Sequence, residues 1–499
     1  MKIKRLLFGL AMLVSVQSVS AQDGNAKPAQ RPTRDPLTLT EEQVGEIKNS
    51  SVLQRLVVGY ANAGDRQRQS WAMAELVEIF PNSGDCKLEL AVLYASLGEK
   101  SKTYDLLMKM KAQGFGYDLT DDPRFAKVAD TKVWTYVVDN LKANLTVFGE
   151  GKVAFELPKG DTLFESLGWD PKRKQFLVGS AREGKVYLAD DKGRVRDFIA
   201  PNTNNGLWSV YGLAVDAERD LLYVASTASV FYTAFKQNDF GKAGIFKFQL
   251  SSGKFLDRHL LGGNGVHTLS TITVSTNGQV FAADGVRNII YTIDGDKLKA
   301  IAADPSLPSI RGLAASDDGK LLYFADYQLG VFGVHLATGA GFAVDYNRES
   351  LVLGGIDGLY WHDGTLIAIE NGMSPKRVIR LSLSPEGRSI TKVMPIDVAH
   401  PAFALPTYGT IVGEDLYFIA NSQKGLYGQY GELKTGASPQ AVQVFRSNMR
   451  FAWGQAGITT NAVPVRQAPF EEGKKLIREE PTLGRPSPQP TPPKPAKKD

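Results

Sequence analysis

Hydrophobic and polar residues follow two different patterns along this chain. In its N-terminal part, apolar side chains share one helical face, as Leu53, Leu56 and Tyr60 do, and leucine, alanine, glutamate and lysine dominate. Further along, apolar and polar residues alternate, and turns rich in glycine, aspartate and asparagine separate the alternating stretches. The two patterns predict an α-helical N-terminal domain over residues 39–143 and a larger β domain over residues 144–460.

The β domain repeats. Six short apolar segments each follow a polar turn, and their anchor residues lie 42–58 positions apart: Phe176, Leu222, Val280, Leu322, Leu366 and Leu416. Four-stranded sheets recurring at such a period are typical of β-propeller blades, whereas a β-sandwich is not expected to repeat so regularly. We therefore predict a mainly β fold with a six-bladed β-propeller. The strand expected at 147–156 precedes the first complete unit, so it could complete the last blade and close the ring.

The helical domain also repeats. Tyr60-Ala-Asn-Ala-Gly64 and Tyr94-Ala-Ser-Leu-Gly98 match at an offset of 34 residues, which is the period of the tetratricopeptide helix pair. The motif is incomplete, because Leu53 and Lys87 stand where the tryptophan of that repeat is expected. We predict tetratricopeptide-like repeats that engage a protein partner, and an irregular helical bundle is the alternative.

Both ends of the chain are predicted to lie outside these domains. Residues 1–21 join a basic start to an apolar core and small residues, which is typical of an export signal, and residues 22–38 form a linker. Residues 461–499 are rich in proline and lysine and are expected to be a disordered tail. The expected location is periplasmic or secreted, and with Cys86 as its single cysteine the protein must be stable without internal disulfides.

Composition and motifs exclude several classes of function. The formal charge of +5 falls to +2 when the three basic residues of the export signal are removed, so nothing indicates a nucleic-acid partner. After the N-terminus no apolar run approaches the ~20 residues of a membrane span. Phosphate-binding loops, nucleophile elbows, paired-histidine motifs and cysteine clusters are absent from the sequence. Any site must therefore be assembled from different blades around the central channel.

Three motifs resemble blades of the senescence-marker-protein/gluconolactonase family, the regucalcin-like lactonases: FESLGWD at 164–170, RGLAASDDGKLLYFAD at 311–326 and IDGLYWHDGTLIAIENG at 356–372. The resemblance covers roughly residues 150–425. It implies a divalent cation, calcium or another, which sits in the channel and polarises a sugar lactone. The family holds this cation with a Glu of the first blade, an Asn of the third, an Asn of the fourth and an Asp of the fifth.

The resemblance carries over to the cation ligands only in part. Glu165 and Asp357 match the two acidic positions, but Ser270 and Arg311 stand where the two asparagines are expected. A guanidinium cannot ligate a metal ion. We therefore expect no cofactor; if a cation is bound, Glu165 and Asp357 would hold it. The guanidinium of Arg311 could instead pair with both carboxylates and bind a ligand, although a structural salt bridge or a solvent-directed Arg311 are open alternatives.

Other candidates for the channel are weaker. His267 is a candidate general base, with a packed loop histidine as the alternative. Trp208 and Tyr211 could form an aromatic wall for a sugar or could pack in the core. Asn371 and Asn421 follow equivalent strands, where they could donate to a ligand or satisfy turns.

Two functions are compatible with these residues. The first is a binding protein whose channel takes a small polar, sugar-like or anionic molecule. The second is a metal-dependent sugar-lactone hydrolase, in which Glu165, Asp357 and His267 would be catalytic. The two changed ligand positions favour the binding protein.

Overall fold

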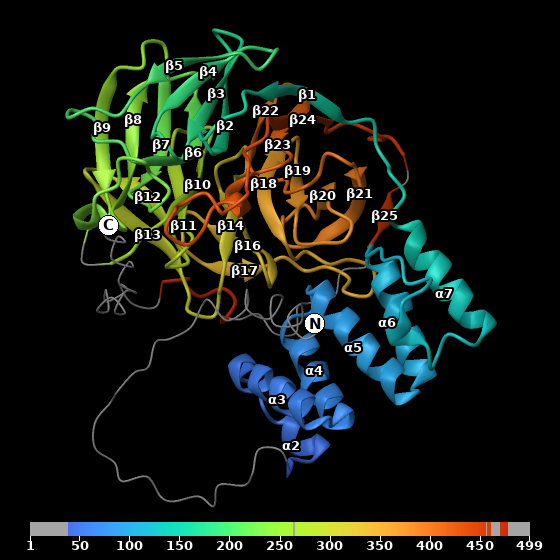
Figure 1. Cartoon of the computed structure of the whole chain (residues 1–499). Coiled ribbons are helices and arrows are strands. Elements are labelled where there is room, and N and C mark those ends of the chain that lie inside the picture. Colours follow the sequence, from blue (N-terminus) through green and yellow to red (C-terminus); the bar gives the residue numbers. More distant parts are fainter. Residues whose placement is uncertain (1–37, 263–264, 456, 461–469, 478–499) are drawn as a thin grey trace, which may run out of the picture. The chain divides into compact units, whose positions relative to one another are not determined.

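Each predicted repeat forms one antiparallel sheet in the computed structural model (Figure 1). Among the described residues these sheets number six, and we call them blades 1 to 6. The first three blades comprise the following strands: β2 (Phe164–Asp170), β3 (Gln175–Ser180), β4 (Val186–Ala189) and β5 (Val195–Ile199) in blade 1; β6 (Ser209–Asp216), β7 (Leu221–Thr227), β8 (Ala243–Gln249) and β9 (Phe255–Leu260) in blade 2; β10 (Leu269–Val274), β11 (Val280–Asp284), β12 (Ile289–Asp294) and β13 (Lys297–Ala303) in blade 3.

The last three blades follow the same order and include two strands from the ends of the β region. Their strands are: β14 (Ile310–Ala315), β15 (Leu321–Asp326), β16 (Gly330–His335) and β17 (Gly341–Ala343) in blade 4; β18 (Ile356–His362), β19 (Thr365–Glu370), β20 (Arg377–Leu383), β21 (Ile390–Val398) and the short β25 (Ile458–Thr459) in blade 5; β22 (Gly409–Val412), β23 (Asp415–Ile419), β24 (Val442–Asn448) and β1 (Lys152–Leu157) in blade 6.

The predicted anchor residues lie on the second strand of every blade. None of these six side chains is more than 4% exposed, because each packs between its own sheet and a neighbouring one: Phe176, Leu222, Val280, Leu322, Leu366 and Leu416. The sixfold repeat read from the sequence is therefore confirmed as a six-bladed β-propeller.

Blade 6 closes the ring with strands from both ends of the β region. Strand β1 pairs antiparallel with β24, from Lys152 opposite Arg446 to Leu157 opposite Val442. Phe155 and Leu157 of β1 are buried in the cluster that joins blades 6 and 1, and burying each such side chain contributes about 1.5–3 kcal/mol. The predicted closing role of the strand near 147–156 is thus confirmed, with β1 as the outermost strand of blade 6.

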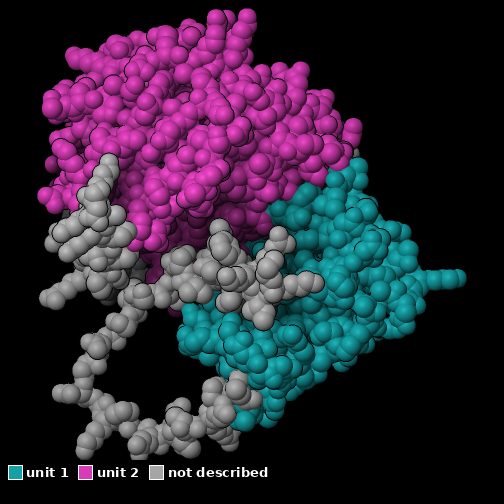
Figure 2. Space-filling model, in the orientation of Figure 1, with its two compact units in different colours: residues 1–146, 348–352, 373–375 teal, residues 147–347, 353–372, 376–499 magenta. Residues whose placement is uncertain are grey.

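The structure describes residues 38–262, 265–455, 457–460 and 470–477, and these fall into two compact units (Figures 1 and 2). Unit 1 holds the helices, and unit 2 holds the propeller. The predicted export signal at 1–21 and the predicted linker at 22–38, except for its last residue, lie outside the described residues. No helix among the described residues has both the length and the apolar content that crossing a membrane would require.

The helices of unit 1 form two pairs with a constant offset. They are: α2 (Glu41–Gly45), α3 (Ser50–Ala63), α4 (Arg66–Ile79), α5 (Gly84–Leu97), α6 (Lys100–Ala112) and α7 (Lys132–Ala143), with a 3-10 turn, η2, at Pro123–Phe125. Helices α3 and α5 begin 34 residues apart (84 − 50), and so do α4 and α6 (100 − 66). Gly64 and Gly98 end α3 and α5 in the left-handed conformation, at φ 74° and 79°, which explains why the repeated motif ends in glycine.

Unit 1 also takes in two short segments of the blade 5 chain. Residues 348–352 and 373–375 belong to it, and Val352 and Met373 are buried in its core together with Phe115. The sequence analysis did not foresee this, because both segments stand between strand patterns and carry no repeat of their own.

The predicted disordered tail needs one correction. Residues 470–477 lie against blades 3 and 4, where Phe470 and Leu476 are buried in the core and Leu476 N donates to Gly339 O at 3.1 Å. The charged, proline-rich composition around these residues hid two apolar anchors. The remainder of 461–499 lies outside the described residues.

Candidate functional site

Five blades carry a β-bulge near the start of their first strand. The pairing of these strands with their neighbours skips a residue at equivalent places, and the skipped residues are Glu165, Tyr211, Ser270, Arg311 (with Gly312) and Asp357. A bulge turns a side chain out of the regular alternation of the sheet and is common beside functional sites. Five residues singled out from the sequence thus occupy one equivalent position in blades 1 to 5.

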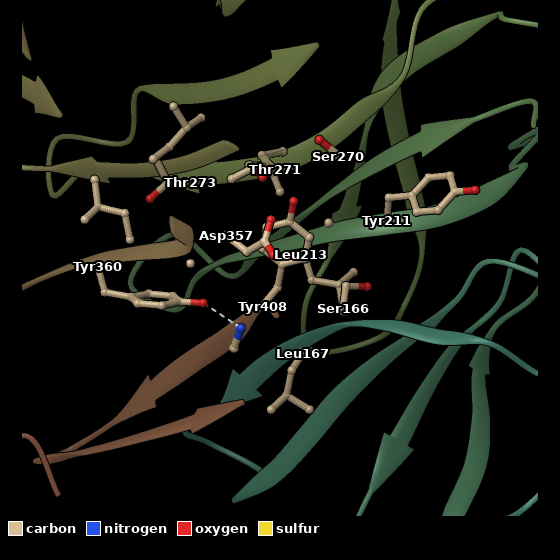
Figure 3. A pocket seen from close by; sticks show the side chains of 17 residues that line it. Ser166, Leu167, Tyr211, Leu213, Ser270, Thr271, Thr273, Asp357, Tyr360 and Tyr408 are labelled. Atoms are coloured by element: carbon tan, nitrogen blue, oxygen red, sulfur yellow. Dashed lines mark hydrogen bonds between the residues drawn. The ribbon is translucent and has the colours of Figure 1, made fainter. Parts of the chain in front are cut away.

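A cavity of about 70 Å³ lies where these strands meet (Figure 3). All six blades contribute to its wall, and the side chains labelled in Figure 3 are Ser166, Leu167, Tyr211, Leu213, Ser270, Thr271, Thr273, Asp357, Tyr360 and Tyr408. The space holds a few water-sized groups. Tyr211, Ser270 and Asp357 are the predicted site residues that line it.

Three hydroxyl groups of the cavity wall lack a partner. The side-chain oxygens of Ser166, Ser270 and Thr271 are buried and form no hydrogen bond with any described residue. Burial and the charge of Asp357 raise the pKa of Tyr408, and the charge of Arg311 and the nearby hydroxyls of Thr271 and Ser270 oppose this rise. An unsatisfied buried hydroxyl costs about 1–3 kcal/mol, so such groups are expected to bind water or a ligand.

Arg311 lies beside this wall in a half-buried setting. Its Nε donates to Ser309 Oγ at 3.2 Å, and its guanidinium lies 5.6 Å from the centre of the Tyr327 ring. Burial opposes its charge, but Tyr408 and Asp357 outweigh this and raise the pKa of Arg311. Among the described residues it forms no direct ion pair with Glu165 or Asp357, which was one of the three possibilities considered from the sequence, but its charge opposes the rise in the pKa of Asp357.

The two acidic residues are each held by a neutral donor. Asn371 Nδ2 donates to Asp357 Oδ2 at 2.6 Å, and Ser422 Oγ donates to Glu165 Oε1 at 2.6 Å. Burial raises the pKa of both carboxyls. Lys424 and Ser422 oppose the rise in the pKa of Glu165, and the charge of Asp357 adds a smaller contribution to it.

Lys424 is the cation that sequence reasoning missed. It lies in the loop after β23, on the 3-10 turn η4 (Lys424–Leu426), with its Nζ 5.6 Å from the ring centres of both Tyr211 and Phe231. Its charge opposes the pKa rise of both Glu165 and Asp357. A lysine in a polar loop gives no sign in the sequence that the loop reaches towards blades 1 and 2.

Tyr408, Ser166 and Thr271 were also missed. Ser166 and Thr271 directly follow the predicted residues Glu165 and Ser270. Their position next to these residues is the signal by which the sequence could have identified them. Tyr408 precedes β22, a first strand without a bulge, and the sixth repeat was recognised only from its second strand.

The other predicted site residues do not line the cavity. Trp208 packs its ring 5.9 Å from that of Phe246 in the core of blade 2. Asn421 donates to Ala441 O and accepts from Gln443 N, so its amide satisfies backbone groups of blade 6 and is not available to a ligand.

His267 is buried and also stands apart from the cavity wall. Its Nδ1 lies 2.6 Å from Asp284 Oδ2, and its Nε2 has no partner among the described residues. The pair has the arrangement of a histidine oriented by a carboxylate, but nothing brings the free nitrogen to the cavity wall.

The cavity residues do not fit a divalent cation well. Within the described residues there is no group of three or more His, Cys, Asp or Glu side chains that could hold a metal ion. Glu165 and Asp357 supply carboxylates, but the positive charges of Arg311 and Lys424 act on the same space. Hard divalent cations require six or more oxygen ligands, and a guanidinium and an ammonium supply none.

Comparison with known proteins identifies similar folds. No protein-family model matches the chain, and no curated protein matches it. Solved structures include the PQQ-bound aldose sugar dehydrogenase of Streptomyces coelicolor, at 15% identity and a TM-score of 0.38 over 60% of this chain and all of that one. A putative oxidoreductase (glucose dehydrogenase) of Thermus thermophilus shares 15% identity at a TM-score of 0.40, over 60% of this chain and 100% of that one.

A gluconolactonase of Xanthomonas campestris is also similar, at 13% identity and a TM-score of 0.39 over 61% of this chain and 92% of that one. At these identities the likeness concerns the fold alone, and none of these proteins places the chain in a family.

Proposed function

We propose that the propeller channel binds a small polar molecule that carries hydroxyl groups and an anionic group, such as a sugar acid. One observation carries the proposal: three buried hydroxyls without partners, those of Ser166, Ser270 and Thr271, line one cavity. Unsatisfied buried groups from separate blades are costly, and a ligand with matching hydroxyls would remove that cost.

The charges around the cavity suggest the anionic part of the ligand. Arg311 offers a planar set of donors, and Lys424 offers an ammonium beside the Tyr211 ring. Small-molecule pockets usually measure about 300–1,000 Å³, which is far larger than the cavity of about 70 Å³. The cavity would therefore take one end of the ligand, and the rest would lie at the mouth near Lys424.

We expect Arg311→Gln and Lys424→Gln each to weaken the binding of gluconate about tenfold, because each removes one charge-assisted hydrogen bond to the carboxylate. Titration calorimetry with the full chain measures this. Lys236→Gln is the matched control, since it removes the same charge from an exposed loop of blade 2 and should leave the affinity unchanged. Equal affinities for all four proteins, or no binding of gluconate or related sugar acids by the unaltered protein, would refute the proposal.

A metal-dependent sugar-lactone hydrolase is the second candidate, and one observation favours it. Glu165 and Asp357 are buried on equivalent bulges with raised pKa values, as carboxyls used in acid–base chemistry often are. Turnover of gluconolactone above its spontaneous hydrolysis, dependent on added calcium and abolished by Glu165→Gln, would favour this function over simple binding. His267, proposed from the sequence as its general base, would then be tested by His267→Gln.

Three wider proposals complete this function. We propose that the chain is exported to the periplasm or secreted, supported by the composition of residues 1–21. We propose that the helices over 39–143 are tetratricopeptide-like repeats that engage a protein partner, supported by their offset of 34 residues. A relationship to the senescence-marker-protein/gluconolactonase family is supported by the two acidic residues at equivalent bulges.

A further inference from the structure

Two loops of the propeller lie against each other. The blade 2 loop, residues 228–242, joins β7 to β8, and the blade 6 loop, residues 420–441, joins β23 to β24. They meet at Gly431, where φ is 79° and an added Cβ would lie 2.0 Å from Val230 O. A side chain at this position would therefore push the two loops apart, and glycine permits the close approach.

Arg182, in the turn between β3 and β4 of blade 1, joins these two loops. Its Nη1 donates to Phe231 O at 2.9 Å and to Gly431 O at 2.8 Å, so one nitrogen bridges the blade 2 loop and the blade 6 loop. Its Nε and Nη2 donate to the two carboxylate oxygens of Asp161, at 2.9 and 2.8 Å, in the segment before β2. The donors of a guanidinium lie in one rigid plane, so these bonds hold both loops to blade 1 at once.

Tyr427 fixes the blade 6 loop to the same group. Its hydroxyl donates to Asp161 Oδ1 at 2.6 Å, and the centre of its ring lies 5.1 Å from the guanidinium carbon of Arg182. Tyr427 is 5% exposed and is buried in one apolar cluster with Tyr211 of the cavity wall. Because Tyr427 directly follows η4, these contacts also hold the turn that carries Lys424.

The position of the Lys424 ammonium depends on both loops. Its Nζ lies 5.6 Å from the ring centres of Tyr211 and of Phe231, whose carbonyl accepts from Arg182. The Phe231 ring in turn meets the Tyr427 ring edge to face, with centres 6.1 Å apart. Lys424 is exposed, and a cation–π contact at an exposed site contributes only about 0.5–1 kcal/mol. The ammonium is therefore placed only as firmly as the two rings and the turn η4 are held.

We propose that Arg182 is a positioning residue for Lys424: it holds the blade 2 loop and the blade 6 loop together, which keeps the ammonium beside Tyr211 for the anionic group of the channel ligand. Arg182 does not line the cavity, so it acts through the loops. This inference rests on the proposed function, whereas the holding of the loops can be measured without any ligand.

The first test is hydrogen exchange of the full chain without ligand, measured by mass spectrometry in peptides from 228–242 and 420–441. Arg182→Gln is expected to speed exchange in both loops by about tenfold or more, because it releases the hydrogen bonds that join them. Arg196→Gln is the matched control, since it removes an exposed guanidinium from β5 of the same blade. Loop exchange as slow in Arg182→Gln as in this control would overturn the proposal.

A milder pair of variants covers the case in which Arg182→Gln does not fold. Tyr427→Phe removes only the hydroxyl that donates to Asp161, and Tyr430→Phe changes a tyrosine of the same loop that is 39% exposed. Faster exchange at 420–441 in Tyr427→Phe alone would then support the proposal, and equal rates in the two variants would refute it.

The second test measures whether the effect of Arg182 passes through Lys424. Titration calorimetry should show that Arg182→Gln weakens gluconate binding up to about tenfold in the unaltered chain, but less than about twofold in the Lys424→Gln variant. Equal losses in both backgrounds would refute the positioning role, because Arg182 would then act independently of the ammonium. A chain that binds no sugar acid would refute the proposed function, and the exchange rates alone would decide whether Arg182 holds the loops.

Discussion

Replacing Lys87 by methionine is expected to flatten the dependence of stability on pH between about pH 7 and about pH 10. Lys87 is 2% exposed; its ammonium donates to Gln113 and lies 5.2 Å from the centre of the Phe115 ring, and it forms no ion pair with any described residue. Burial therefore lowers the pKa of Lys87 from its ordinary value near 10.5 to about 7.

The sign follows from proton binding. Between pH 7 and 10.5 the unfolded chain binds a proton at Lys87 that the folded chain does not, so the free energy of unfolding rises with pH over this range. Across this gap of 10.5 − 7 = 3.5 pKa units the contribution amounts to about 5 kcal/mol. The methionine variant lacks it, and the loss of the bond to Gln113 adds only an offset that does not depend on pH.

Urea unfolding followed by the helical circular dichroism signal measures the effect. The unfolding free energy of the unaltered protein, relative to that of Lys87→Met, should rise with pH by up to about 5 kcal/mol. Lys102→Met, in the next helix and more than half exposed, is the control and should run parallel to the unaltered protein. Parallel curves for Lys87→Met as well would show that folding does not lower the pKa of Lys87 and would refute the prediction.

Replacing Leu476 by alanine is expected to destabilise the propeller by about 2–5 kcal/mol. Leu476 is 1% exposed in the core of blades 3 and 4, with Phe332 and Phe470 around it. It fits there because Gly341 has no side chain: a Cβ at that position would lie 2.3 Å from Leu476 Cγ. The contraction to alanine leaves a cavity that the rigid sheet cannot fill.

Urea unfolding followed by the β-sheet signal measures this loss. Lys475→Ala changes the neighbouring exposed residue and should alter the unfolding free energy by less than about 0.5 kcal/mol. Stability equal to that of the unaltered protein in Leu476→Ala would mean that residues 470–477 do not contribute to the propeller core. A loss of stability in Leu476→Ala but not in Lys475→Ala would therefore show that residues 470–477 are packed on the propeller through Leu476.

The arrangement of charges around the channel explains why binding is favoured over metal-assisted hydrolysis. Glu165 and Asp357 keep the positions that the family resemblance assigns to cation ligands, whereas Arg311 and Lys424 bring two fixed cations to the same space. Fixed cations next to carboxylates reduce the field that would attract a divalent ion. The same two cations can pair with the carboxylate of a ligand.

The sequence by itself determined the propeller, because the alternation of apolar residues and the repeat of anchors such as Leu322 and Leu366 are local patterns. It also singled out Glu165, Tyr211, Ser270, Arg311 and Asp357, which proved to share one bulge position. Equivalent positions in the repeats converge on the propeller axis regardless of loop conformation. Aligning the repeats was therefore enough to identify these five residues.

Only the tertiary structure decided the rest. Lys424 reaches the channel through a loop without a repeat, and Leu476 docks from a segment whose composition resembles a solvated tail. The guanidinium of Arg311, which lies on a bulge, is placed over the Tyr327 ring, whereas the sequence left open whether it pairs with the two carboxylates. The membership of Met373 in the helical core depends on contacts across more than two hundred residues of chain, which no local pattern can encode.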